Sequence, residues 1–258
     1  MFDREVDILR TLSHSNVVRF VDVMKDSCHM YLIMEKCSGG EVFEKLLQVK
    51  VFPEQEAVDL FAQVLHAIEY IHSLNIIHRD VKAENFLYSS DGTVKLIDFG
   101  LSVQLKTDTE YLSAVVGSVH YLAPEMIRQR YSKPVDLWSA GIMFYLLLFG
   151  RYPYEGSEEN VMNQIKHHSP KWKHERLSTS ALNFLQTLLE RDPRKRATAT
   201  AALSHPFICS SDRTTQADED EGSEENQEWC MIAGQNVSGN TPRLQIYTDP
   251  IETCNFNL

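Results

Sequence analysis

The stretch IIHRDVKAENFLYSSDGTVKLIDFG, residues 76–100, gathers several side chains suited to catalysis or metal binding into one short segment. They are Asp80, Lys82, Asn85 and Asp98. Two runs of β-forming residues flank the Asp91-Gly92 pair, which is typical of a tight hairpin turn. We therefore expect Asn85 and Asp98 to lie near each other, at the outer ends of one hairpin.

The residues before this stretch predict a helix, a hairpin and a second helix. Apolar residues recur at helical spacing in FDREVDILRTL, with Glu5 beside them, which predicts an amphipathic helix. The runs VVRFVDVM and MYLIME, separated by KDSCH, predict a β-hairpin. Pro53 is expected at the start of a helix that keeps its apolar spacing for about five turns and leads to His78.

The residues after it predict a mainly helical region from Tyr131 almost to Phe207. We expect one helix over residues 136–149, another capped by Ser178, and a short one after Thr198. Residues 209–258 differ, because they lack apolar periodicity and hold many like charges, which predicts disorder.

Composition and charge narrow the class of protein. The chain is 43% hydrophobic, as expected of a globular protein. Its net charge of -11 is mostly local, since residues 209–258 contain ten acids and two bases and leave only -3 for the rest. Without a basic excess, we expect neither nucleic acid nor membrane as a partner.

Three further features bear on location and metals. The apolar run at residues 141–150 is about half of a membrane span, and five scattered cysteines favour a reducing compartment, so we expect a cytoplasmic protein. The DEDEG run at 218–222 superficially resembles a calcium loop. Its glycine stands at the fifth position and not the sixth, so we expect no direct calcium site.

The motifs HRDVKAEN, DFG, GSVHYLAPE and DLWSAGIMFYLLLFGRYPY, in this order, resemble the catalytic core of a eukaryotic protein kinase. The amino-acid sequence of these motifs is most similar to that of the serine/threonine kinases of the calmodulin-dependent and calcium-dependent group. The resemblance implies an α+β, two-lobed fold over residues 1–208. Its small lobe would be a remnant at 1–36 and its mainly helical large lobe would cover 37–208, followed by the acidic tail at 209–258.

The resemblance also implies catalytic roles, with ATP and Mg²⁺ as cofactors. Asp80 would orient the substrate hydroxyl and accept its proton, and Lys82 would neutralise charge on the transferred phosphate. Asn85 and Asp98 would hold Mg²⁺. Ser118 would bridge Asp80 and Lys82, and this, with Lys82 itself, favours serine or threonine over tyrosine as the target.

Further positions are implied for the nucleotide and the peptide. Backbone groups of Glu35 and Cys37 would bond adenine, with Met34 behind it and Leu87 beneath. Glu41 would read an arginine before the target residue, as in basophilic relatives. A helix glutamate, here Glu5, pairs in the family with a lysine. The remaining implied contacts are an ion pair of Glu125 with Arg196, packing of Phe99 against Leu9 and His78, and a backbone turn at Gly100.

The chain also departs from the family pattern. It starts at the helix of Glu5, without the preceding glycine-rich loop and lysine, so we expect a truncated small lobe and an unpaired Glu5. Ala114 stands where many relatives have a phosphothreonine, so a phosphate for Arg79 would have to come from Ser113, Thr109 or Thr107.

From the ordered motifs we predict a serine/threonine protein kinase. The alternative is a kinase-like scaffold without activity, and the GSVHYLAPE motif argues against a small-molecule kinase.

Overall fold

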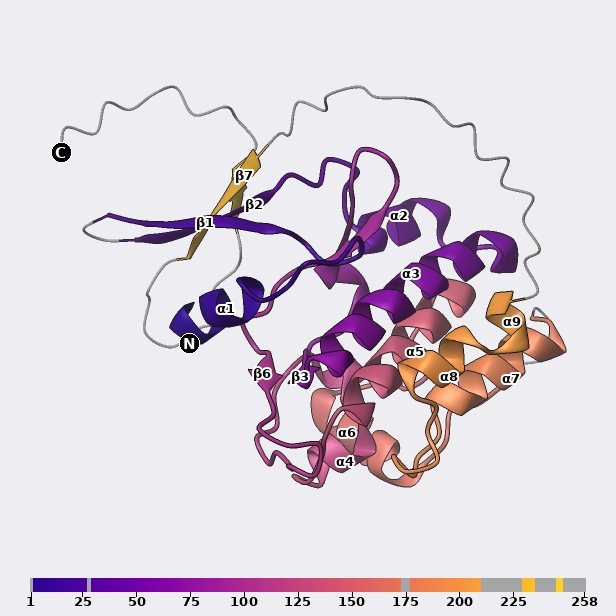
Figure 1. Ribbon diagram of the computed structural model, residues 1–258. Helices are drawn as coiled ribbons and strands as arrows, with labels where there is room; N and C mark the ends of the chain where they lie inside the picture. The colour runs from indigo at the N-terminus through magenta and orange to yellow at the C-terminus, as the bar shows by residue number, and fades with distance from the viewer. Residues whose placement is uncertain (1, 27–28, 173–176, 210–228, 235–244, 248–258) are drawn as a thin grey trace.

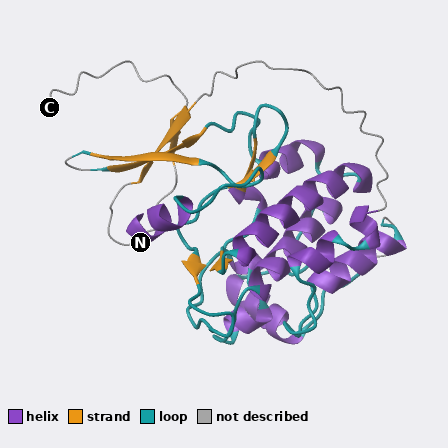
Figure 2. Ribbon diagram, in the orientation of Figure 1, coloured by secondary structure: helices purple, strands orange, loops and turns teal. Residues whose placement is uncertain are grey.

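The computed structural model describes residues 2–26, 29–172, 177–209, 229–234 and 245–247, and arranges them as a small β-containing lobe and a larger helical lobe (Figure 1). Most strands gather in the small lobe and most helices in the large one (Figure 2). This is the α+β, two-lobed fold that the motifs predict. Within the described ranges, no helix is both long enough and apolar enough to span a bilayer.

The N-terminal part of the small lobe folds as predicted. Its elements are α1 (Phe2–Leu9), β1 (Phe20–Lys25) and β2 (Met30–Glu35). The two strands pair antiparallel, from Phe20 opposite Met34 to Lys25 opposite Met30. Leu9 of α1 is buried with Met34, so the apolar stripe of the helix packs inward.

Two further strands of this sheet come from the C-terminal part of the chain, β7 (Trp229–Gly234) and β8 (Gln245–Tyr247). β7 pairs antiparallel with β2 along its whole length, and the strand order is β1-β2-β7-β8. The predicted disorder of the tail is therefore wrong for both segments and for Cys209, which ends a helix. Pairing with β2 supplies backbone hydrogen bonds that no local pattern reveals. The DEDEG run and the rest of the tail lie outside the described residues.

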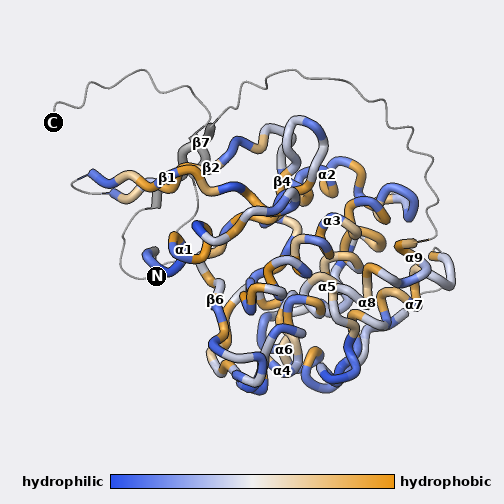
Figure 3. Tube along the Cα trace, in the orientation of Figure 1, coloured by the Kyte–Doolittle hydropathy of each residue, from blue (hydrophilic) through white to orange (hydrophobic). Residues whose placement is uncertain are grey.

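The large lobe is built around two long helices that pack against each other. The helices are α2 (Val42–Val49), α3 (Glu54–Ser73), α4 (Pro124–Ile127), α5 (Pro134–Phe149), α6 (Glu158–His167), α7 (Thr179–Leu188), α8 (Ala199–Leu203) and α9 (Pro206–Cys209). Phe61 of α3 stacks on Phe144 of α5 with ring centroids 3.7 Å apart, and Phe184 of α7 lies 6.0 Å from Phe144. Nearly all of α5 is buried, and its hydrophobic residues lie inside the lobe (Figure 3).

The helix ends follow the predicted chemistry with small shifts. Ser178 accepts a backbone N–H group at the start of α7, so the predicted cap is confirmed, and Thr198 does the same for the predicted short helix α8. Pro53 precedes α3 as its N-cap residue and is not its first residue. α5 starts at Pro134, two residues before the predicted start, because proline tolerates the first helical position.

A short central hairpin connects the lobes. Its strands are β4 (Phe86–Tyr88) and β5 (Val94–Leu96), directly preceded by the 3₁₀ turn Ala83–Asn85. β3 (Ile76–Ile77), before this turn, pairs with β6 (Val103–Gln104), after the hairpin. Leu96 exchanges backbone hydrogen bonds with the Asn16–Val18 segment of the small lobe. On the other side, Gly39 donates its N–H to the Tyr88 carbonyl at 2.8 Å. A Cβ at Gly39 would lie 2.6 Å from Tyr88 Cβ, so this approach requires glycine.

Candidate active site

The catalytic-loop backbone is anchored by Asp136 of α5. This carboxylate is fully buried and accepts the backbone N–H groups of His78 and Arg79 at 2.9 Å, while His72 Nε2 lies 2.8 Å away. Burial alone would raise the pKa of Asp136, but His72 and the backbone donors hold it below its ordinary value. Sequence reasoning missed this residue, although a single acid in an otherwise apolar helix was a usable signal.

Asp80 projects from this anchored loop into a polar cluster. Lys82 Nζ lies 2.6 Å from Asp80 Oδ2, and Ser118 donates its backbone N–H and its hydroxyl to Oδ1 at 3.0 and 3.1 Å. Lys82 also donates to Ser118 Oγ at 3.2 Å, so the predicted Ser118 bridge is confirmed. Burial alone would raise the pKa of Asp80, but Lys82, His78 and the Ser118 N–H lower it. The carboxylate is therefore ionised and accepts hydrogen bonds at neutral pH.

Asn85 and Asp98 lie at the outer ends of the central hairpin, as predicted. The amide nitrogen of Asn85 donates to the Asp80 carbonyl oxygen at 2.8 Å, which leaves its amide oxygen as an acceptor. Ile97 donates its N–H to the Asn85 carbonyl at 2.9 Å, and this bond brings the end of β5 next to Asn85. An amide oxygen and a carboxylate are hard donors, so this pair fits a Mg²⁺ ion.

The predicted backbone turn at Gly100 is present, since Ser102 donates its N–H to the Phe99 carbonyl at 2.9 Å. Asp98, just before it, has a left-handed backbone with φ of 58°. Gly100 also provides space, because a Cβ there would lie 3.1 Å from Asp98 Oδ1 and 3.5 Å from Glu5 Oε2. Phe99 between them packs edge-on against His78, with centroids 5.1 Å apart, as predicted. A residue other than glycine with a left-handed backbone is strained, and such strained residues are common at functional sites.

Glu5 of α1 reaches the same corner. Burial raises its pKa, and the nearby charge of Asp98 raises it further, to about 7. Among the described residues, no lysine or arginine forms an ion pair with Glu5. The expectation that Glu5 lacks a cation therefore holds for this part of the chain.

The segment predicted to contact adenine continues β2 toward α2. Met34 and Leu87 are both buried, and Cys37 is half-buried. The Glu35 N–H donates to the Arg19 carbonyl at 3.0 Å, and the Glu35 carboxylate pairs with Lys95 of β5 at 2.9 Å. Glu35 is thus joined to the central hairpin, to which Leu87 itself belongs, while the contacts of all four positions with a nucleotide stay predictions.

Three acids gather where α2 begins. Glu41 is the N-cap residue of α2, and its backbone N–H donates to the Glu44 carboxylate at 3.2 Å. Burial raises the pKa of Glu41, and the charges of Glu44 and Glu84 raise it further. Glu84 Oε2 is buried without a hydrogen-bond partner among the described residues. Sequence reasoning missed Glu84, which stands in the HRDVKAEN motif beside Asn85.

Away from this corner, the predicted ion pair of Glu125 with Arg196 is confirmed. Two nitrogens of the Arg196 guanidinium donate to the two oxygens of Glu125, at 2.5 and 3.0 Å, and both side chains are buried. Arg196 also lies over the Trp138 ring, 5.1 Å from its centroid. The pair fastens the start of α4 to the segment before α8.

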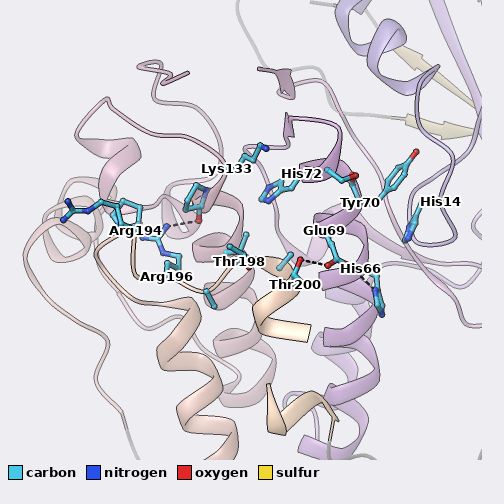
Figure 4. Close-up of a pocket in the computed structure, with 16 residues that line it drawn as sticks. His14, His66, Glu69, Tyr70, His72, Lys133, Arg194, Arg196, Thr198 and Thr200 are labelled. Atoms are coloured by element: carbon cyan, nitrogen blue, oxygen red, sulfur yellow. Dashed lines mark hydrogen bonds and ion pairs between the residues drawn. The ribbon is translucent and has the colours of Figure 1, made fainter. Parts of the chain in front are cut away.

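A cavity of about 710 Å³ lies elsewhere, between α3, the start of α5 and residues 193–200 (Figure 4). None of the predicted site residues lines it. Its lysine and arginine side chains already have acidic partners in the chain, which are Asp108 for Lys133, Asp192 for Arg194 and Glu125 for Arg196. The arrangement suited to chemistry is therefore the corner around Asp80.

Comparison with known proteins agrees with this geometry. The protein kinase domain family matches residues 1–208. Calcium-dependent protein kinase 11 of Arabidopsis thaliana is 41% identical over 213 residues, which are 80% of this chain and 43% of that protein. Calcium/calmodulin-dependent protein kinase type 1B of Rattus norvegicus is 39% identical over 218 residues, 81% of this chain and 62% of that protein.

The chain spans less than half of the length of the first of these relatives. The family match nevertheless runs over residues 1–208, which include the catalytic loop, the central hairpin, the helical lobe and all of the quoted motifs. The chain therefore belongs to the protein kinase domain family.

Proposed function

We propose that this chain is a serine/threonine protein kinase that transfers the γ-phosphoryl group of ATP to hydroxyls of proteins. The observation that carries the proposal is the Asp80 carboxylate, held between Lys82 and Ser118 at 2.6 to 3.1 Å. Protein kinases use ATP and Mg²⁺, and the oxygen donors of Asn85 and Asp98 fit the ion. When bound, Mg²⁺ neutralises charge on the phosphates.

The side chains of the site would divide the reaction as follows. Asp80, ionised because its pKa is lowered, accepts the hydrogen bond of the substrate hydroxyl and then its proton. The hydroxyl oxygen forms a bond to the γ-phosphorus while the bond to ADP breaks. Lys82 places a positive charge beside Asp80 and the incoming phosphoryl group, and Ser118 fixes the orientation of both.

The test is a phosphotransfer assay of the full chain with γ-labelled ATP, Mg²⁺ and peptides that offer serine, threonine or tyrosine. Asp80→Asn keeps the shape and removes the base, so kcat should fall by about 10² to 10⁴. Glu159→Gln, an exposed acid on α6, is the matched control and should retain full activity. Labelling of tyrosine alone, or equal activity of Asp80→Asn and the control, would contradict the proposal.

A second candidate, a kinase-like scaffold without activity, is favoured by the Glu5 corner. Two acids, Glu5 and Asp98, face each other there without a lysine or arginine among the described residues. Thermal unfolding with ATP, with and without Mg²⁺, separates the two functions. A ligand at 100 times its dissociation constant stabilises by about 2.7 kcal/mol. If ATP produces no thermal shift and the chain transfers no phosphate, the scaffold is the function that remains.

We also propose that the acids at the start of α2 bind a basic residue, an arginine for preference, upstream of the target hydroxyl. Support comes from the raised pKa of Glu41 and from the buried, unpartnered oxygen of Glu84, both of which a guanidinium would relieve. Glu41→Gln or Glu84→Gln should raise KM for an arginine-containing peptide roughly tenfold. KM for the same peptide with alanine in place of arginine should not change, and equal effects on both peptides would exclude this role.

A cytoplasmic location stays a prediction. Fractionation of cells that express a tagged chain would test it, and recovery in the membrane or secreted fraction would contradict it.

A further inference from the structure

The guanidinium of Arg79, next to Asp80, is buried without an acidic partner in the part of the chain that the structure describes. Its Nε donates to the Leu101 carbonyl at 2.7 Å, and its Nη1 donates to the Tyr131 hydroxyl at 3.2 Å. The side chain is 8% exposed, and no carboxylate among the described residues forms an ion pair with it. A buried cation needs compensating acceptors, and here both of those acceptors are neutral oxygens.

The Tyr131 hydroxyl also holds the exposed segment before Ser118. It donates to the Ala114 carbonyl at 2.6 Å while it accepts from Arg79. The Tyr131 backbone exchanges two hydrogen bonds with Leu112, at 2.8 and 3.1 Å. Tyr131 itself is 1% exposed, whereas the side chains of residues 113–115 are exposed. Tyr131 is therefore what fixes this segment, and not packing of the segment's own side chains.

The same segment ends on the catalytic aspartate. Ser118 donates twice to Asp80, and Gly117 before it presses against the Arg79 carbonyl, since a Cβ at Gly117 would lie 2.5 Å from that oxygen. The run from Ala114 to Ser118 is thus tied to adjacent catalytic-loop residues at both ends. Tyr131 secures one end through Arg79, and Asp80 secures the other.

We infer that Tyr131 is a positioning residue, whose hydroxyl orders the segment of Ser118 through Arg79 so that the site is assembled without phosphorylation of residues 107–115. The inference rests on the proposed kinase function. It differs from a requirement for a phosphate on Ser113 or a neighbouring threonine, because Arg79 already has two acceptors. The substrate that depends on this ordering is the peptide, since Ser118 contacts Asp80 and Lys82.

The first measurement compares Tyr131→Phe with Tyr111→Phe in phosphatase-treated full chain. Tyr131→Phe keeps the ring and removes the hydroxyl that connects Arg79 to the Ala114 carbonyl, a connection called the junction below. The value of kcat/KM for the peptide should therefore fall about tenfold, while KM for ATP changes less than twofold. Tyr111 is exposed in the same segment and its ring lies over Arg130, so its phenylalanine variant should stay within twofold of the unmodified chain. Equal behaviour of the two variants would overturn the inference.

The second measurement asks whether the junction acts through the charge of Arg79. Ala114→Glu in the Tyr131→Phe background supplies a carboxylate next to the lost hydroxyl and should recover most of the peptide kcat/KM. Ala114→Gln in the same background has the same size without charge and should recover none. A purely structural role for the ring would give equal results for both, which would overturn the inference.

Two controls separate this inference from the proposed function. If phosphatase treatment or Ser113→Ala abolishes activity of the otherwise unmodified chain, a phosphate is required and the inference is wrong. If the unmodified chain transfers no phosphate at all, the proposed function fails, but hydrogen exchange still tests the junction. The amide of Leu112, which donates to the Tyr131 carbonyl, should then exchange at least tenfold faster in Tyr131→Phe than in Tyr111→Phe. Equal exchange would overturn the inference.

Discussion

Two acids removed from solvent to different degrees, one in each lobe, have pKa values shifted in opposite directions. Asp136 in the large lobe is fully buried, yet His72 and two backbone N–H groups overcome the effect of burial and lower its pKa. Glu5 in the small lobe is partly buried, and burial with the charge of Asp98 raises its pKa to about 7. Burial alone thus does not decide whether a carboxyl group is ionised, because the hydrogen-bond donors and charges around it can outweigh burial.

The contrast extends to the elements that hold these acids. Asp136 belongs to α5, the central helix of the large lobe. In the same lobe, both carboxylate oxygens of the buried Glu125 accept hydrogen bonds from Arg196. Glu5 belongs to α1, which accompanies a sheet completed by strands from the far end of the chain. Asp136 and Glu125 of the large lobe therefore have partners within that lobe, whereas Glu5 of the small lobe has no lysine or arginine partner among the described residues.

The largest expected effect comes from breaking the satisfied side of the comparison. Asp136→Asn keeps the volume but removes the charge that the His78 and Arg79 amides and His72 share. We expect the free energy of unfolding to fall by about 3 to 4 kcal/mol, because charge-assisted bonds in the interior are lost together. Urea denaturation measures this directly. Glu159→Gln on the surface is the control, and a loss below about 1 kcal/mol would show that the anchor contributes little.

An intermediate and opposite effect is expected from Glu5→Gln in metal-free buffer. Because the folded pKa of about 7 lies above the ordinary 4.5, the folded state favours the protonated acid, so stability from this group is present below pH 4.5 and falls as the pH rises through 7. Glutamine removes the charge, so at pH 8 the variant should be more stable by about 1 to 3 kcal/mol.

The pH dependence of the same variant provides its control. The gain should shrink as the pH falls and vanish below pH 4.5, where Glu5 becomes protonated in both the folded and the unfolded state. Asp3→Asn, an exposed acid on the same helix, should show no gain at any pH. A constant difference between pH 4.5 and 8, or a destabilised Glu5→Gln at pH 8, would mean that Glu5 is ionised with a partner in the folded state.

How much of this could be read from the sequence depends on whether a contact is local to a motif. The hairpin of Asn85 and Asp98 was predictable, because its turn and its β-forming runs are adjacent in the chain. The contact of Ser118 with Asp80 and the pair of Glu125 with Arg196 were predictable only through the family resemblance. Neither follows from spacing, since each joins residues more than thirty positions apart.

What escaped prediction is equally physical. Asp136 and Tyr131 bind the catalytic loop across more than fifty residues, and although a single acid in an apolar helix marks Asp136 as unusual, nothing near either residue identifies the loop as its partner. The left-handed backbone of Asp98 was not predicted either, because an aspartate adopts this conformation less readily than glycine. β7 was missed because the acidic composition around it indicated disorder, and a strand that pairs with β2 across two hundred residues has no local signal.

The smallest expected effect tests whether the small lobe depends on that distant strand. A chain that ends after residue 228 removes β7 and β8, and one that ends after residue 247 keeps both. A two-stranded hairpin is marginal in water, so the shorter chain should lose about 1 kcal/mol in stability, with faster amide exchange confined to β1 and β2. The amides of α5 should keep their protection in both chains, since β7 pairs only with strands of the small lobe. If β2 exchanges at the same rate in both chains, the sheet is stable without its C-terminal strands, and the unpaired Glu5 alone sets the small lobe apart.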